Sequence, residues 1–244
     1  MPHNQATRRR FLTSCLLGTS GLFLSSAVAR TITGEMPWSP GRAEVPPAYP
    51  ELRFFTESER RCVDAITARL IPTDESGPGA REAGVMDFID SQMAGFYGRA
   101  ERWYMQGPFH EGTDQQGYQS EFPPAELYRQ AIKSLDAHCR GVHDDRVFAD
   151  LSEPDQDEIL QRMEDGKLEL DGVSAKGFLE LVMDNAVEGF FCDPLYGGNR
   201  DMIGWKLVGF PGARYDYRDF LDHNGERINL EPVGLKGRPA WNPA

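Results

Sequence analysis

Apolar residues recur at the 3.6-residue period of an α-helix in several segments separated by loops, and this pattern most constrains the fold. The first segment begins at a capping box formed by Thr56 and Glu59 and ends at Pro72. Its apolar residues fall on one face of a helix: Cys62, Val63, Ile66, Leu70 and Ile71. The pattern predicts a helix whose inner face packs in a core.

Further helices are predicted along the chain. Residues 80–95 and 124–143 carry apolar residues at helical spacing, and Ser152 and Ser174 stand at N-cap positions ahead of two more helices. The aromatic residues 96–104 are also predicted to be helical, whereas 106–124 lose the periodicity and indicate a long loop. We therefore predict a mainly α fold: a single helical domain over 54–244 with long irregular loops, little or no sheet, and an irregular C-terminal segment from about residue 191.

The first 29 residues have the features of an export signal rather than of a folded domain. A twin arginine stands ahead of a modestly apolar run that is too short for a membrane span and contains Thr, Ser and Gly. The residues of the twin-arginine (Tat) motif are Arg8, Arg9, Phe11 and Leu12, and those of the cleavage site are Ala27 and Ala29. An ordinary secretory signal is the alternative. Residues 30–53 are rich in Pro and Gly and are predicted to form an arm or linker.

The formal net charge of −12 argues against a nucleic-acid partner, because phosphate contacts need clustered Lys and Arg. Cleavage of the signal would remove three arginines and no acid, which makes the chain more acidic still. This charge suits a periplasmic protein or one that binds a basic partner.

Three cysteines would remain after cleavage: Cys62, Cys139 and Cys192. In an oxidising compartment the odd number indicates one intrachain disulfide with a spare thiol, an intermolecular bridge, or buried free cysteines. Cys192 is the first candidate for a bridge to a partner, because it adjoins the glycine-rich segment described below. No Cys-x-x-Cys-His motif is present, which excludes covalently attached haem.

The chain offers no motif for catalysis, cofactor binding or metal binding. It has no dinucleotide-binding glycine motif, no phosphate-binding loop and no glycine-framed nucleophilic serine. His138 and His143 lie five residues apart, about 140° around an ideal helix, so they share no face for a metal. We predict no catalytic, cofactor-binding or metal-binding residue in this chain.

A glycine-rich segment, residues 192–205, follows the last predicted helix directly. One interpretation is a turn region that folds back on the helical core, with Trp205 and Phe210 filling gaps. The other is a binding surface, since irregular backbone often presents binding groups, and Trp and Tyr are favoured at interfaces. The predicted partner-interface residues are Cys192, Asp193, Tyr196, Gly197, Gly198, Asn199, Trp205 and Phe210.

Several short motifs, in this order and spacing, resemble the gluconate 2-dehydrogenase subunit 3 family, the small subunit of bacterial sugar dehydrogenase complexes. They are LIPTD at 70–74, GAREAGV at 79–85, FID at 88–90, DPLYGGN at 193–199, GW at 204–205 and PG at 211–212. The resemblance runs from about residue 55 to 212, without the 106–124 loop.

The resemblance implies a non-catalytic small subunit that binds a large FAD-containing dehydrogenase subunit of the glucose–methanol–choline type. It also implies passage of that partner through the Tat translocase to the periplasm, with a c-type cytochrome (haem c) as a third subunit in some complexes. The substrate would be gluconate, another sugar or a polyol. Two alternatives remain: a stand-alone periplasmic enzyme with an unrecognised site, and a free-standing structural or binding protein of the cell envelope.

Overall fold

A computed structural model describes residues 54–110, 112–214, 217–226 and 230–235. The chain divides into two units, Met1–Trp38 and Ser39–Ala244, and every described residue belongs to the second. The predicted Tat motif, cleavage site and 30–53 arm therefore lie outside the described residues.

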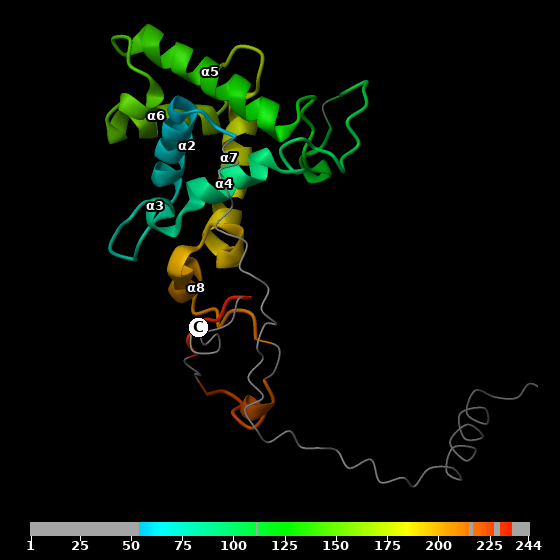
Figure 1. The fold of residues 1–244 in the computed structure, drawn as a ribbon. Helices are drawn as coiled ribbons and strands as arrows, with labels where there is room; N and C mark the ends of the chain where they lie inside the picture. Colours follow the sequence, from blue (N-terminus) through cyan, green and yellow to red (C-terminus); the bar gives the residue numbers. More distant parts are fainter. Residues whose placement is uncertain (1–53, 111, 215–216, 227–229, 236–244) are drawn as a thin grey trace, which may run out of the picture. The chain divides into compact units, whose positions relative to one another are not determined.

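The described part of the chain is mainly α-helical, as predicted (Figure 1). Its only β contacts are isolated bridges, at 74–77, 170–173 and 212–233. Within this part, every helix falls short of the length and apolar character that crossing a membrane requires. The α-helices are α2 (Glu57–Leu70), α3 (Ala80–Ala83), α4 (Val85–Ala94), α5 (Pro124–Val142), α6 (Glu153–Glu164), α7 (Ala175–Phe191) and α8 (Ile203–Val208).

Three helices begin at the caps that the sequence predicts. The Thr56 hydroxyl accepts the Glu59 N–H, and the Glu59 carboxylate accepts the Thr56 N–H at 2.8 Å, which completes the capping box of α2. At the start of α6 the Ser152 hydroxyl accepts the Asp155 N–H, and at the start of α7 the Ser174 hydroxyl accepts the Gly177 N–H. Each cap satisfies a backbone donor that the first helical turn leaves without a partner.

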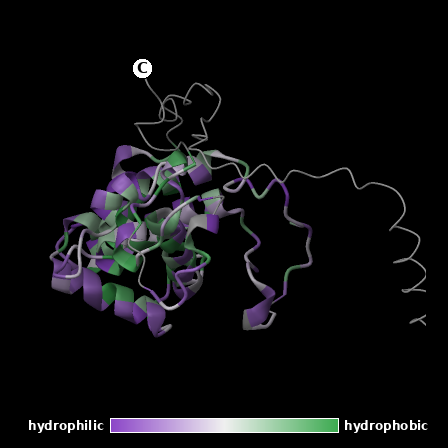
Figure 2. Cartoon of the chain, turned by 90° about the horizontal axis from the view of Figure 1, so that it is seen from below, coloured by the Kyte–Doolittle hydropathy of each residue, from purple (hydrophilic) through white to green (hydrophobic). Residues whose placement is uncertain are grey.

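The core surrounds α7, which packs against α2, α3, α4, α5, α6 and α8. In Figure 1, α5 and α6 lie at the N-terminal end of α7 and α8 lies at its C-terminal end. Hydrophobic residues gather between the helices and hydrophilic ones on their outer sides (Figure 2). The largest fully buried side chains include Ile66, Ile89, Tyr128, Leu135, Phe148, Phe178 and Phe190.

Two helix predictions are wrong in part. The helix predicted over 80–95 is broken at Gly84, whose φ of 72° interrupts the helical backbone between α3 and α4. Residues 96–104 form turns rather than a helix. There Ala100 has a φ of 51°, and a Cβ on Gly98 would lie 2.1 Å from the Met93 carbonyl oxygen. The chain bends back on the end of α4, so helical spacing of the aromatic residues does not produce a helix.

Candidate functional site: the C-terminal end of α7

The glycine-rich segment packs backbone to backbone against the last turn of α7. A Cβ on Gly198 would lie 2.1 Å from the Gly189 carbonyl oxygen, and one on Gly204 would lie 2.2 Å from that of Phe190. Side chains at these positions would push the segment off the helix. The close approach explains both glycines without a bound ligand.

Asn199 is fully buried and holds the segment in place. Its side-chain amide donates to the Cys192 carbonyl at 2.8 Å, and its side-chain oxygen accepts the Gly204 N–H at 2.8 Å. Its own backbone N–H donates to the Gly189 carbonyl at 2.9 Å. Asn199 therefore joins both ends of the segment to α7 and has no polar group left for a partner at its surface.

Trp205 is also buried, with 6% of its surface exposed. Its indole N–H donates to the Phe191 carbonyl at 2.7 Å, which satisfies a carbonyl at the end of α7. Its ring meets Phe210 edge to face at 5.2 Å, and Phe210 is 46% exposed. Trp205 thus supports an exposed aromatic side chain while being buried itself.

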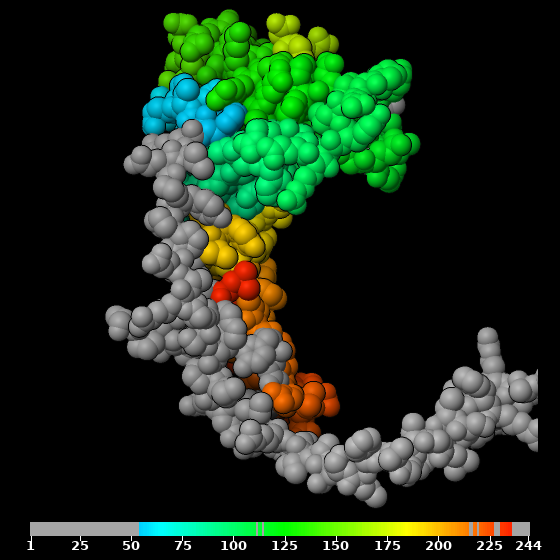
Figure 3. All heavy atoms as spheres, turned by 45° about the vertical axis from the view of Figure 1, so that its right-hand side comes forward, coloured from blue at the N-terminus to red at the C-terminus, as the bar shows by residue number. Residues whose placement is uncertain are grey.

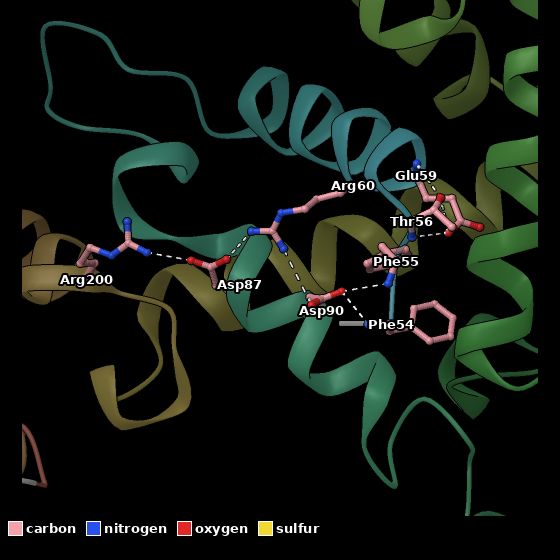
Figure 4. A network of polar contacts seen from close by, with 8 residues as sticks. All are labelled: Phe54, Phe55, Thr56, Glu59, Arg60, Asp87, Asp90 and Arg200. Carbon is pink, nitrogen blue, oxygen red and sulfur yellow. Dashed lines mark hydrogen bonds and ion pairs between the residues drawn. The ribbon is translucent and has the colours of Figure 1, made fainter. Parts of the chain in front are cut away.

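A polar network connects the glycine-rich segment to α4, α2 and the first described residues (Figure 4). Asp87 pairs with Arg60 on one side and with Arg200 on the other, and the distance to the Arg200 guanidinium is 2.8 Å. Asp90 lies 3.8 Å from Arg60 and accepts the backbone N–H groups of residues 54 and 55, at 3.1 and 3.0 Å. The network therefore links the segment, through α4 and α2, to the first described residues.

Asp193 binds residues 230–235 at the glycine-rich segment, next to the end of α7. Its carboxylate accepts the Leu195 N–H at 2.9 Å and the Leu235 N–H at 2.6 Å. Nearby, Gly212 and Val233 form a parallel bridge, and the φ of Gly212 is 78°. Residues 230–235 therefore lie beside the end of α7.

The predicted interface residues separate into two groups. Tyr196 and Phe210 are exposed, and Cys192, Asp193 and Gly197 are partly buried. Gly198, Asn199 and Trp205 are buried, so their prediction as direct contact residues is corrected: they build the surface from inside.

Sequence reasoning missed other exposed apolar residues around this end of α7. Figure 3 shows the yellow end of α7 meeting the orange segment around α8 at the surface. These residues are Met183, Val187, Phe191, Leu207 and Val208, each at least 38% exposed. For the three of these residues that lie on α7, Met183, Val187 and Phe191, their helical spacing could have indicated a shared exposed face.

The three described cysteines are free thiols. Cys62 and Cys139 are buried in the core as free thiols, which is one of the arrangements that the sequence left open. Burial raises the pKa of the partly buried Cys192 thiol to about 11. Because thiol–disulfide exchange needs the thiolate, Cys192 reacts slowly at neutral pH in this conformation. A bridge from Cys192 to a partner stays a prediction.

The family model for gluconate 2-dehydrogenase subunit 3 matches residues 57–212. The chain belongs to the gluconate 2-dehydrogenase subunit 3 family. No curated protein and no solved structure matches the chain. The range matched by the subunit 3 family runs across the 106–124 loop and ends at Gly212, where the bridge to Val233 begins. It includes the entire glycine-rich segment and all of α7.

At this site of the subunit 3 chain, most polar side chains bond within the chain. The polar side chains of Asp193, Asn199, Arg200 and Trp205 are all engaged in internal bonds. Across the described ranges, no three His, Cys, Asp or Glu side chains come together as a metal site. The site also presents exposed aromatic and apolar side chains, among them Tyr196, Leu207 and Phe210, and such side chains are common at protein interfaces.

Proposed function

We propose that this chain is the non-catalytic small subunit of a periplasmic FAD-dependent dehydrogenase that oxidises gluconate, another sugar or a polyol. In this proposal it binds the large flavoprotein subunit, of the glucose–methanol–choline type, and carries it in the folded state through the Tat translocase. The observation that carries the proposal is family membership across residues 57–212, together with the twin arginine ahead of the domain.

The geometry at the end of α7 supports a binding role. The glycine-rich segment uses its glycines and buried polar groups to hold one conformation, and exposed aromatic residues stand on that base. A rigid base with exposed aromatic side chains is how protein interfaces limit the entropy lost on binding. The FAD of the complex belongs to the partner in this proposal, and haem c to a cytochrome subunit where one is present.

The test is co-export. The tagged full-length chain is expressed with the flavoprotein subunit, and FAD-containing protein is measured in the periplasmic and cytoplasmic fractions. With the native signal we expect the flavoprotein to co-purify with this chain from the periplasm. Changing Arg8 and Arg9 to Lys should keep both proteins in the cytoplasm, because the twin arginine is the feature that the translocase reads.

Arg10→Lys is the matched control, since it changes the adjacent arginine and leaves the pair intact. Export of the flavoprotein should be unaffected by it. The proposal is overturned if the flavoprotein reaches the periplasm regardless of Arg8 and Arg9. It is also overturned if the chain is exported alone and binds no flavoprotein.

A further inference from the structure

The exposed side of α7 combines an apolar stripe with an acidic one. Met183, Val187 and Phe191 lie at i, i+4 and i+8 on one helix face, with 39, 44 and 38% of their surfaces exposed. Asp184 and Glu188 lie beside them, one position further round the helix. We call these five residues the α7 outer face.

The apolar stripe is unusual because α7 is the central helix of the domain. Its other sides pack against neighbouring helices, and residues such as Phe178, Val182 and Ala186 are fully buried. A helix that is apolar on nearly all sides is normally covered on all sides. Among the described residues, one side of the second half of α7 is left uncovered.

The acidic stripe lacks the counter-charges that other acids of the domain have. Asp87, Asp64 and Asp157 each pair with an arginine, whereas Asp184 and Glu188 make no ion pair with any described residue. Burial, and then the charge of Asp184, raise the pKa of Glu188. The two acids repel each other at i, i+4 spacing and are ready to accept cations from outside the chain.

We propose that the α7 outer face is the docking site for the flavoprotein subunit, which meets it with an apolar ridge flanked by Lys or Arg side chains. This inference rests on the proposed function and says which surface of the chain the flavoprotein contacts. The face continues into the glycine-rich segment, because the Phe191 carbonyl binds Trp205 and the Trp205 ring supports the exposed Phe210. Apolar burial would supply affinity, and the acidic pair would orient the partner.

A second copy of this chain fits the face less well. A symmetric dimer built on this face would bring Asp184 and Glu188 of both copies close to one interface, and the formal net charge of each copy is −12. Like charges at an interface disfavour association. A basic partner surface removes this repulsion and also provides the missing ion pairs.

The first test places a charge within the apolar stripe. Val187→Asp is compared with Val142→Asp, which makes the same change at a 58% exposed valine at the end of α5. The full-length variants are titrated with the flavoprotein subunit. We expect Val187→Asp to weaken binding about tenfold or more and Val142→Asp to leave it within about twofold. Val187→Ser, which adds no charge, should weaken binding less, and thermal unfolding of each variant confirms that it folds.

The second test reverses the acidic pair. Asp184→Lys with Glu188→Lys should weaken binding of the flavoprotein about tenfold, and the loss should shrink as salt is raised because salt screens the charges. Glu158→Lys is the control, since Glu158 is exposed and lies on α6, outside the α7 outer face. It should change binding by less than about twofold.

The outcomes separate this inference from the proposed function. If the unaltered chain binds no flavoprotein, the proposed function fails and the docking site fails with it. If the unaltered chain binds and folded Val187→Asp binds equally well, only the docking site is overturned. A chain that is dimeric alone and becomes monomeric on Val187→Asp, with flavoprotein binding unchanged, assigns the face to a second copy and also overturns it.

Discussion

Helices α6 and α7 begin alike and face solvent differently. Each is capped by a serine, and each packs in the same core, α6 along one side and α7 along most of its sides. The exposed side of α6 carries acids and Gln161, and Asp157 binds Arg69 through two bonds of 2.7 Å. The exposed side of α7 carries Met183, Val187 and Phe191 beside its acids.

The acids of the two helices also differ in how their surroundings shift their pKa. The hydrogen bonds from Arg69 lower the pKa of Asp157, whereas burial raises the pKa of Glu188. The charged groups of α6 are therefore satisfied within this chain and in water. On α7, Lys176 and Glu180 pair with each other, whereas Asp184 and Glu188 have no ion pair with any described residue. Unpaired acids beside apolar side chains are typical of a surface that is completed by a partner.

The largest expected effect is at the base of the α7 surface. Trp205→Ala removes a buried ring and its hydrogen bond to the Phe191 carbonyl, so we expect a loss of about 3–5 kcal/mol in unfolding free energy, measured by denaturant titration. If Trp205 instead only contacts a partner, stability will hold and binding alone will fall. Trp205→Phe, which keeps an aromatic ring, should cost less.

Asn199→Ala should have the next largest effect. It leaves the buried N–H of Gly204 and the carbonyl of Cys192 without their partners, which we expect to lower the unfolding free energy by about 2 kcal/mol. Asn199→Asp keeps an acceptor for Gly204 but places a buried carboxylate beside the Cys192 carbonyl oxygen, so at neutral pH it should be at least as destabilising as Asn199→Ala. Equal stability of Asn199→Ala and the unaltered chain would show that the segment is not held by this side chain.

The serine caps test whether α6 and α7 are equivalent as helices. Ser152→Ala and Ser174→Ala should each cost about 1 kcal/mol in unfolding free energy, since each removes one bond to a first-turn N–H. Similar losses, measured by thermal unfolding, would confine the difference between the helices to their exposed faces. A much larger loss at one serine would show that the helices also differ at their starts.

The smallest effect on the chain alone is expected at the exposed stripe. Val187→Ser should change the unfolding free energy by no more than about 0.5 kcal/mol, because the Val187 side chain is 44% exposed to solvent and loses little packing on substitution. A loss of several kcal/mol would mean that Val187 belongs to the core, and the contrast between α6 and α7 would disappear.

Glu188 provides a pH test with a defined sign. Because its pKa is raised in the folded state, its charge disfavours folding, and this cost grows as the pH rises through the titration range of the carboxyl. Glu188→Gln should therefore raise the melting temperature slightly at neutral pH and lose that advantage in acid. Asp157→Gln should show the opposite pH dependence, since Asp157 is stabilised in its charged form.

Local features of the fold were predictable from the sequence. The caps at Thr56, Ser152 and Ser174 depend on side chains within three residues of the backbone groups they bind. The buried stripe of α5 depends only on helical spacing. The motifs that resemble the subunit 3 family, and the range they span, could also be read from the sequence and agree with the matched range.

The tertiary structure decided which residues of the glycine-rich segment are buried and which are exposed. Asn199 and Tyr196 lie three residues apart in the same irregular stretch, and nothing local assigns one to the interior and the other to the surface. That assignment follows from the close approach of Gly198 and Gly204 to the end of α7. It also decided that α7 keeps one apolar side uncovered, because burial of a helix face depends on which helices pack against it, and helical periodicity does not contain that information.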